Sequence, residues 1–207
     1  MKNYYIGIAG NIGVGKTTFT EMLCEKHNWD PHYEVVIDNP YLKDFYKDMN
    51  RWSFHLQIFF LSKRFQVQKK ISSLTNTIVQ DRTIYEDARI FARSIYEIGN
   101  MPKRDWENYN ELFNEMTSYL KKPDLIVYLK ASTDTLIDHI ESRGRDYEKN
   151  IDLEYLHLLN IHYDRWINDL EKTGKIDTMT VDMNTNDIID DHSFRENIFN
   201  KVYNKLK

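Results

Sequence analysis

The chain has 207 residues, a length that suits one α/β domain with a sizeable hydrophobic core. Its formal net charge of -4 excludes the basic surface typical of proteins that bind nucleic acid or anionic membranes. The single cysteine, Cys24, excludes an internal disulfide, and no apolar run approaches the ~20 residues of a membrane span. We therefore expect a cytoplasmic protein, without a signal peptide because an apolar strand begins almost at once.

A glycine-rich turn follows the first apolar run, at 4–9, and leads into an amphipathic segment. The residues of this turn and of the start of the segment are Gly10, Asn11, Ile12, Gly13, Val14, Gly15, Lys16, Thr17 and Thr18. Strand, turn and helix in this order form a phosphate-binding loop, in which backbone N–H groups and the helix N-terminus hold an anion. Lys16 should reach the β- and γ-phosphates of a nucleoside triphosphate, and the Thr17 hydroxyl should bind Mg²⁺.

The remaining segments alternate between strands and helices. The expected strands lie at about 4–9, 33–36, 77–80, 125–129 and 178–181. The expected helices lie at about 16–28, 41–48, 52–74, 86–98, 106–120, 133–143 and 152–170, with a terminal helix opened by a capping box at 193–196. This alternation predicts a three-layer α/β fold, in which helices flank a five-stranded parallel sheet within one domain over 1–207.

Charged residues follow three of the expected strands at their C-terminal ends, which is where parallel sheets bind ligands. The phosphate-binding loop follows the first strand, Glu34 lies near the end of the second, and Asp81 and Arg82 follow the third. An acid and an acid–arginine pair beside a triphosphate indicate a phosphoryl-transfer centre.

From Glu34 onward the chain resembles the deoxyribonucleoside kinases, most closely the bacterial deoxyadenosine/deoxyguanosine kinase branch. The residues that carry this resemblance are Glu34, Asp38-Asn39-Pro40-Tyr41, Phe45-Tyr46-Lys47-Asp48, Arg51-Trp52-Ser53-Phe54, Gln57, Arg64, Asp81-Arg82-Thr83, Asp87, Phe91, Arg143-Gly144-Arg145 and Glu148. The resemblance covers about 4–182 and implies a P-loop nucleoside/nucleotide-kinase-like fold with a short arginine-bearing lid at about 143–150. Two residues, Val35 and Tyr147, depart from the family pattern, and neither has a chemical role here.

The activity implied is ATP-dependent 5′-phosphorylation of deoxynucleosides, a salvage reaction. A 5′-hydroxyl is a weak nucleophile, so a carboxylate must accept its proton, and Glu34 is the candidate base. Arg82 would bridge the base, the 5′-oxygen and the transferring phosphoryl group. Asp81 would complete the Mg²⁺ site, and Arg143 and Arg145 in the lid would bring positive charge to the transition state.

The resemblance also assigns residues to the acceptor nucleoside. Tyr46 and Glu148 would hold the sugar 3′-hydroxyl. Trp52 and Phe91 would line the slot for the base, although core packing is the ordinary role of both rings. In relatives the long helices also pack together in a homodimer, and the end-product triphosphate inhibits the enzyme, so we expect a dimer and inhibition by dATP.

The base preference follows from three polar residues. Gln57 and Arg64 are seven residues apart on the long helix and so project from one face, against which Asp87 lies in relatives. The Gln57 amide can donate to adenine N1 and accept from its N6 amino group, while Arg64 donates to N7 and Asp87 holds the guanidinium. We expect deoxyadenosine to be preferred, followed by deoxyguanosine or deoxycytidine, with thymidine last.

Other functions remain as alternatives at this point. A deoxyguanosine- or deoxycytidine-preferring enzyme, or one of broad specificity, would use the same residues. A thymidylate-type monophosphate kinase would need basic residues around its acceptor phosphate, which Glu34 would repel. A GTP-hydrolysing switch would need Asn-Lys-x-Asp, and the nearest match, at 204–207, lacks the Asp.

Substitution of Glu34, the candidate general base, should abolish most of the activity. Replacing Glu34 by Gln preserves the shape of the side chain but removes its ability to accept a proton. Steady-state kinetics should show a loss of ~10²–10⁴ in kcat with most nucleoside binding retained. Turnover close to the wild-type rate would show that Glu34 is not the base.

Overall fold

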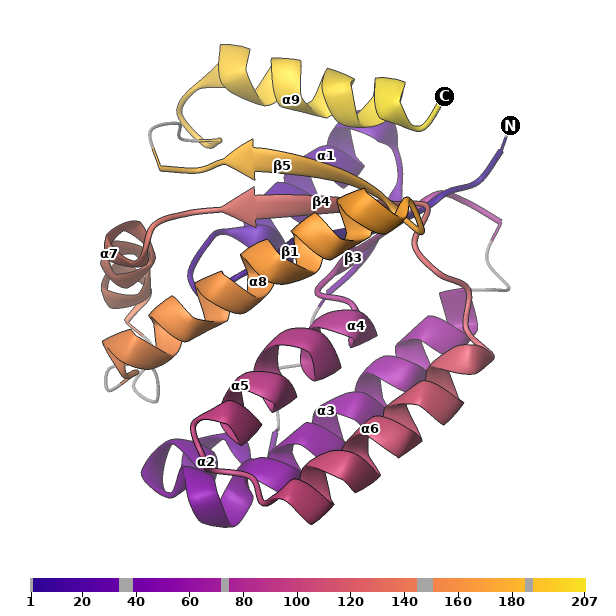
Figure 1. Cartoon of the computed structure of the whole chain (residues 1–207). Coiled ribbons are helices and arrows are strands. Elements are labelled where there is room, and N and C mark those ends of the chain that lie inside the picture. Colours follow the sequence, from indigo (N-terminus) through magenta and orange to yellow (C-terminus); the bar gives the residue numbers. More distant parts are fainter. Residues whose placement is uncertain (1, 34–38, 72–74, 145–150, 185–187) are drawn as a thin grey trace.

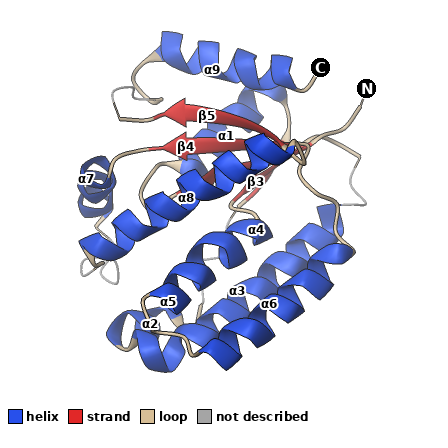
Figure 2. Ribbon diagram, in the orientation of Figure 1, coloured by secondary structure: helices blue, strands red, loops and turns tan. Residues whose placement is uncertain are grey.

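The protein is described by a computed structural model over residues 2–33, 39–71, 75–144, 151–184 and 188–207. Within these ranges five parallel strands form one sheet in the order β2-β3-β1-β4-β5 (Figures 1 and 2). The strands are β1 (Tyr5–Gly10), β2 (Asp30–His32), β3 (Ile78–Asp81), β4 (Leu125–Lys130) and β5 (Asp177–Asp182). The predicted five-stranded parallel sheet is thereby confirmed.

The central strands are apolar along most of their length because helices cover both faces of the sheet. On β4, Leu125, Val127 and Leu129 pack on one face, whereas Ile126 and Tyr128 pack on the other. This alternation divides the core into two layers of side chains, as the period of a strand requires.

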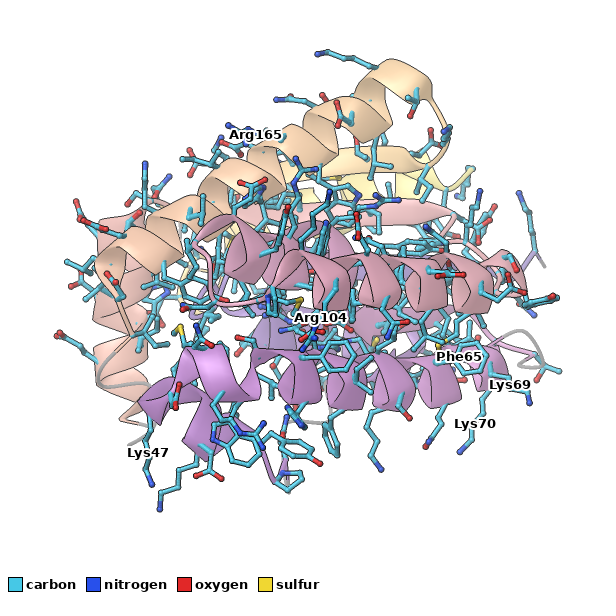
Figure 3. The ribbon with its side chains drawn as sticks, turned by 60° about the horizontal axis from the view of Figure 1, so that its bottom comes forward. Lys47, Phe65, Lys69, Lys70, Arg104 and Arg165 are labelled. Atoms are coloured by element: carbon cyan, nitrogen blue, oxygen red, sulfur yellow. The ribbon has the colours of Figure 1, made fainter. Side chains whose placement is uncertain are left out.

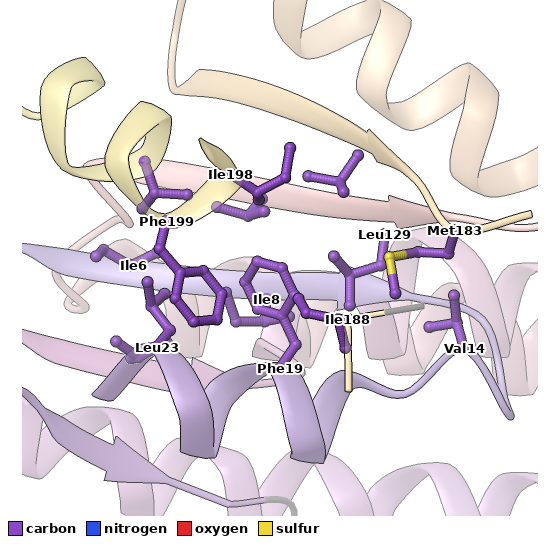
Figure 4. Packing of buried hydrophobic residues seen from close by; sticks show 14 of the residues in the cluster. Ile6, Ile8, Val14, Phe19, Leu23, Leu129, Met183, Ile188, Ile198 and Phe199 are labelled. Atoms are coloured by element: carbon purple, nitrogen blue, oxygen red, sulfur yellow. The ribbon is translucent and has the colours of Figure 1, made fainter. Parts of the chain in front are cut away.

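The first face is covered by α1 (Lys16–His27) and α9 (His192–Lys205). Phe19 of α1 meets Phe199 of α9 edge to face, with ring centroids 5.3 Å apart (Figure 4). This is a favourable geometry for two buried aromatic rings. The contact joins the helix that follows the glycine-rich turn to the C-terminal helix.

The second face is covered by α8 (Leu153–Thr173), α3 (Met49–Ile71) and the helical run after β3. That run comprises α4 (Ile84–Glu86), the π-helix η1 (Asp87–Ala92) and α5 (Arg93–Glu97), where the sequence pattern predicts one regular helix. The remaining helices are α2 (Leu42–Lys47), α6 (Lys103–Ser118), which packs beside α3, and α7 (Thr133–Arg143). Within the described residues, no helix has both the length and the apolar character needed to cross a membrane.

The second strand begins earlier than predicted. The sequence pattern predicts a strand at about 33–36, but β2 is Asp30–His32 and Tyr33 lies beyond its end. Pro31 is tolerated because β2 is an edge strand, where one side of the backbone has no neighbour to receive an N–H. Residues 34–36 of the predicted strand and 72–74 of the predicted long helix lie outside the described residues.

The predicted capping box of the terminal helix is wrong. Asp191 is the N-cap of α9, and its Oδ1 accepts a hydrogen bond from the Phe194 N–H at 2.9 Å. Glu196, expected to cap the helix from within, instead forms an ion pair with Lys26 of α1. The helix is capped two residues earlier than predicted, and Glu196 is paired with a residue of another helix instead of capping α9.

This correction generates a prediction about stability. Replacing Asp191 by Ala removes the side chain that satisfies a free N–H of α9, and should lower the free energy of unfolding by about 1 kcal/mol. The matched control, Ser193→Ala, alters the exposed residue of the predicted box and should change stability by less than about 0.5 kcal/mol. Denaturant unfolding measures both. A larger loss of stability from Ser193→Ala than from Asp191→Ala would support the predicted capping box at 193–196 instead of the Asp191 cap.

Candidate active site

The glycine-rich turn after β1 needs two of its glycines for different reasons. Gly13 has φ +87, and a Cβ there would lie 2.8 Å from the carbonyl oxygen of Leu136 and 2.8 Å from Ile140 Cγ1. Gly15, the N-cap of α1, has φ +90 but open space around it. The first glycine therefore permits close approach of α7, and the second permits a left-handed backbone.

Helix α8 holds this turn in place through Asn11. The Asn11 Nδ2 donates to the Leu156 carbonyl at 2.9 Å and to Asn160 Oδ1 at 2.8 Å, while its Oδ1 accepts from the Ile12 N–H at 2.7 Å. The buried Lys16 Nζ donates to the Asn11 carbonyl at 2.9 Å. No motif in the sequence marks Asn160, because its role exists only once α8 packs on the turn.

Thr17 and Asp81, the two predicted Mg²⁺ ligands, lie in direct contact. The Thr17 hydroxyl donates to Asp81 Oδ2 at 2.6 Å, across the gap between the start of α1 and the end of β3. Asp81 is buried, and its Oδ1 has no hydrogen-bond partner among the residues that the structure describes. A buried carboxylate oxygen without a partner beside a hydroxyl fits the oxygen ligands that Mg²⁺ prefers.

Arg82 has a strained backbone and a constrained side chain. Its φ is +63, an unfavourable value for a residue with a Cβ. Its carbonyl accepts from Arg64 Nη1 at 3.2 Å, and its Nη1 donates to the Tyr163 hydroxyl at 3.2 Å. The guanidinium carbon lies 4.3 Å from the centre of the Phe91 ring, a cation–π contact.

Glu86 lies beside Arg82 and was not identified from the sequence. Its Oε1 accepts from the Tyr163 hydroxyl at 2.9 Å and from the Gly10 N–H at 3.4 Å. Its Oε2 accepts from the Thr83 N–H at 2.8 Å. The only available signal, a glutamate three residues after a threonine, predicts a helix cap and not a site residue.

The charge of Glu86 is set by opposing effects. Complete burial raises the pKa of its carboxyl, because the charged form loses hydration. The cations of Arg82 and Lys16 act in the opposite direction, as do the hydrogen bonds from Thr83 and Tyr163. Acidic and basic groups thus lie together where β1 and β3 end.

A buried ion pair joins Arg64, which also contacts the Arg82 carbonyl, to Asp87. Arg64 Nε is 2.6 Å from Asp87 Oδ2, and both side chains are almost fully buried. Gln57 is buried on the same helix as Arg64, and its Oε1 has no hydrogen-bond partner within the described part of the chain. Because leaving a buried amide oxygen unpaired is costly, this atom indicates a place where a ligand donates a hydrogen bond.

Aromatic residues predicted to contact the nucleoside share one hydrophobic cluster. Tyr46, Trp52 and Phe91 are all partly buried against it. Trp52 lies under the Arg51 guanidinium, whose carbon is 4.7 Å from the ring centre. Phe91 contacts Tyr163 edge to face, with centroids 6.5 Å apart. These rings therefore pack against the core, and their predicted contact with the nucleoside stays a prediction.

Comparison with known proteins decides the family. The family model described as "Deoxynucleoside kinase" matches residues 6–207. The chain belongs to the deoxynucleoside kinase family. It is a deoxynucleoside kinase, an enzyme that phosphorylates deoxynucleosides.

The similar proteins come from several organisms. The kinase is 38% identical over 203 residues to deoxyadenosine/deoxycytidine kinase of Bacillus subtilis (strain 168), covering 97% of this chain and 92% of that protein. It is 41% identical over 172 residues to deoxyadenosine kinase of Dictyostelium discoideum, covering 83% and 70%. The structure of deoxyadenosine kinase from M. mycoides with bound dATP superposes with a TM-score of 0.85 at 31% identity, covering 97% and 100%. The family and fold implied by the resemblance are thereby confirmed.

Some predicted residues of the kinase are not placed by the structure. Glu34, Arg145 and Glu148 lie outside the described residues, as does the lid segment 145–150. Arg143 is the last residue of α7 and is exposed, followed by Gly144 in a left-handed conformation. The roles predicted for these four residues therefore stay predictions.

Proposed function

We propose that this kinase transfers the γ-phosphoryl group of ATP to the 5′-hydroxyl of a deoxynucleoside and prefers deoxyadenosine. The observation that carries the base preference is the buried Arg64–Asp87 pair, together with a Gln57 oxygen on the same helix that has no hydrogen-bond partner among the described residues. The family membership and the likeness to a deoxyadenosine kinase with bound dATP support the same reading.

The donor phosphates would bind the loop from Gly10 to Thr18, at the N-terminus of α1. Lys16 is a buried cation at this point, and its charge would serve both ATP binding and transfer. We assign Mg²⁺ to Thr17 and Asp81, whose oxygens fit it. When bound, this ion neutralises charge on the phosphates.

At the acceptor side we assign Glu34 as the general base and Arg82 as the cation that contacts the transferring group. Arg82 is supported by its place at the end of β3, one residue after Asp81. Arg143 and Arg145 would supply further positive charge from the lid. Tyr46 and Glu148 would bind the sugar, with Trp52 and Phe91 beside the base.

Discrimination between bases follows from hydrogen-bond direction. Adenine presents an acceptor beside an amino group, which matches the amide of Gln57, and cytosine presents the same pair of groups. Thymine presents O4 where an amino group is needed, so two acceptors oppose each other in a buried place. Such a mismatch costs about 1–3 kcal/mol, which corresponds to roughly tenfold to hundredfold in kcat/KM.

The experiment that tests this function is phosphorylation of the four deoxynucleosides with ATP. We expect deoxyadenosine first, deoxyguanosine or deoxycytidine next and thymidine last. The double variant Arg64→Met/Asp87→Ala removes the ion pair as a unit and should erode the adenine preference and raise relative use of thymidine.

A matched control for that variant is Lys103→Met/Glu107→Ala, which removes an exposed ion pair on α6 and should leave the ranking unchanged. Thymidine as the best wild-type substrate would contradict the proposal. An unchanged ranking in Arg64→Met/Asp87→Ala would show that Gln57, Arg64 and Asp87 form a structural cluster and not a reader of the base.

We further propose that dATP inhibits the enzyme competitively with ATP. One molecule would place its triphosphate in the donor loop and its deoxyadenosine moiety in the acceptor pocket. It would gain both sets of contacts but lose translational and rotational freedom only once. Initial rates at varied ATP should show dATP raising the KM for ATP without lowering kcat. Equal behaviour of dATP and dTTP at millimolar concentrations would contradict this.

A homodimer is proposed through α3 and α6, which run side by side (Figure 3). Partly exposed apolar residues lie along both helices, including Phe65 on α3 and Met116 on α6, and Leu112 is exposed. An apolar surface along two adjacent helices is typical of a protein–protein interface.

We also propose that residues 1–207 act as one cytoplasmic kinase domain. A single sheet joins β1 near the N-terminus to β5 near the C-terminus, which supports one folding unit. Cys24 is a free, buried thiol, and burial raises its pKa to about 12, so it stays protonated and unreactive at neutral pH.

A further inference from the structure

Three segments distant in sequence meet at the Glu86 carboxylate. Arg82 Nη1 donates to the Tyr163 hydroxyl at 3.2 Å, and that hydroxyl donates to Glu86 Oε1 at 2.9 Å. The same oxygen accepts from the Gly10 N–H at 3.4 Å, where β1 enters the phosphate-binding loop. A continuous hydrogen-bonded chain therefore joins the Arg82 guanidinium to the loop through α8.

Both carboxylate oxygens of Glu86 accept hydrogen bonds. Oε1 receives the Gly10 N–H and Oε2 receives the Thr83 N–H, and a backbone N–H can only donate. Burial raises the pKa of Glu86 above its usual range, and the cations Arg82 and Lys16 and the converging donors only partly oppose this shift. The position of the side chain is therefore set by these hydrogen bonds.

A role in helix capping accounts for only half of these contacts. The Oε2 contact with Thr83 caps α4, as a glutamate at this position does in a capping box. The Oε1 contacts with Gly10 and Tyr163 have no part in that cap. They orient the tyrosine hydroxyl toward Arg82, which a simple cap would not require.

Packing against two other rings fixes the orientation of the Tyr163 ring, and therefore the position of its hydroxyl. The side chain is fully buried, stacks on Tyr128 with ring centroids 5.6 Å apart and meets Phe91 edge to face. Phe91 also lies against the Arg82 guanidinium. The arginine is thereby contacted by an aromatic face and by a hydroxyl that Glu86 holds.

We propose that Glu86 and Tyr163 are positioning residues, which fix the Arg82 guanidinium where it meets the transferring phosphoryl group. The proposal rests on the role of Arg82 in the proposed function. Arg82 also has a strained backbone, and residues of this kind persist only where the surrounding structure holds them. Glu86 accepts a hydrogen bond from the Tyr163 hydroxyl, which in turn accepts one from the Arg82 guanidinium, so the position of Glu86 is transmitted to the arginine.

The test is Tyr163→Phe, which removes only the hydroxyl. Misplacing a group that acts in the transition state by about 1 Å costs up to ~10²-fold, so kcat should fall about tenfold to a hundredfold. The KM values for ATP and deoxyadenosine should change less than about twofold, because uniform binding is retained. Glu86→Gln replaces one carboxylate oxygen by an amide NH₂ group, which faces a hydrogen-bond donor of Gly10, Thr83 or Tyr163. This variant should lower kcat by at least as much.

Tyr128→Phe is the matched control. It removes the hydroxyl of the ring stacked on Tyr163, a hydroxyl bonded to Asp164 at 3.1 Å and not to Arg82. It should leave kcat unchanged, while thermal unfolding shows whether the two tyrosine variants are equally folded. A Tyr163→Phe enzyme with wild-type kcat, whatever its melting temperature, would overturn the proposal.

A double-mutant comparison separates positioning from general packing. In an Arg82→Lys background the tyrosine hydroxyl has lost its guanidinium partner, so adding Tyr163→Phe should lower the residual kcat by less than about twofold. A reduction as large as in the wild-type background would mean that Tyr163 acts independently of Arg82, which overturns the proposal. Full activity in Arg82→Lys alone would overturn the role assigned to Arg82. A wild-type enzyme without activity on deoxynucleosides would instead overturn the proposed function itself.

Discussion

The parallel pairing of β1 with β3 is the constraint on which the active site depends. Ile8 pairs with Asp81 in this register, and the Arg82 N–H donates to the Ile8 carbonyl at 3.1 Å. Because the two strands run in the same direction, the glycine-rich turn and the Asp81-Arg82 pair emerge at the same edge of the sheet. A shift of one residue in this register would send Asp81 to the opposite face and separate it from Thr17.

Helices on the second face complete the site by supplying partners for buried charge. Leaving a charge unpaired in a protein interior is far more costly than leaving an apolar group there. Arg64 is paired with Asp87, and Glu86 receives donors from α8, from β1 and from its own helix. The π-helical turn of η1 begins at Asp87 and contains Phe91, so an irregular segment carries the partner of Arg64 and the ring that contacts Arg82. Such segments occur frequently at functional sites.

Helix α8 contacts both the glycine-rich turn and the residues around Arg82. Asn160 and the Leu156 carbonyl hold Asn11 of the turn, and Tyr163, about one turn further on, reaches Arg82 and Glu86. One rigid helix thus sets the geometry of the loop and of the arginine together. Tertiary contacts from α8 therefore give the turn and the arginine a fixed position relative to each other.

Local chemistry in the sequence determined the parallel sheet, most helices and the glycine-rich turn between β1 and α1. Glycines at positive φ precede α1, Lys16 and Thr17 begin it, and the contact between Thr17 and Asp81 follows from the pairing of β1 with β3. Only the tertiary structure decided where β2 lies, that Asp191 caps α9, and that Glu86 and Tyr163 flank Arg82. In each case a local pattern was compatible with two outcomes. A proline is tolerated at a sheet edge, and a glutamate after a threonine can cap a helix and also hold a distant tyrosine. The choice depends on which residues from remote parts of the chain come within hydrogen-bond distance, and no single segment contains that information.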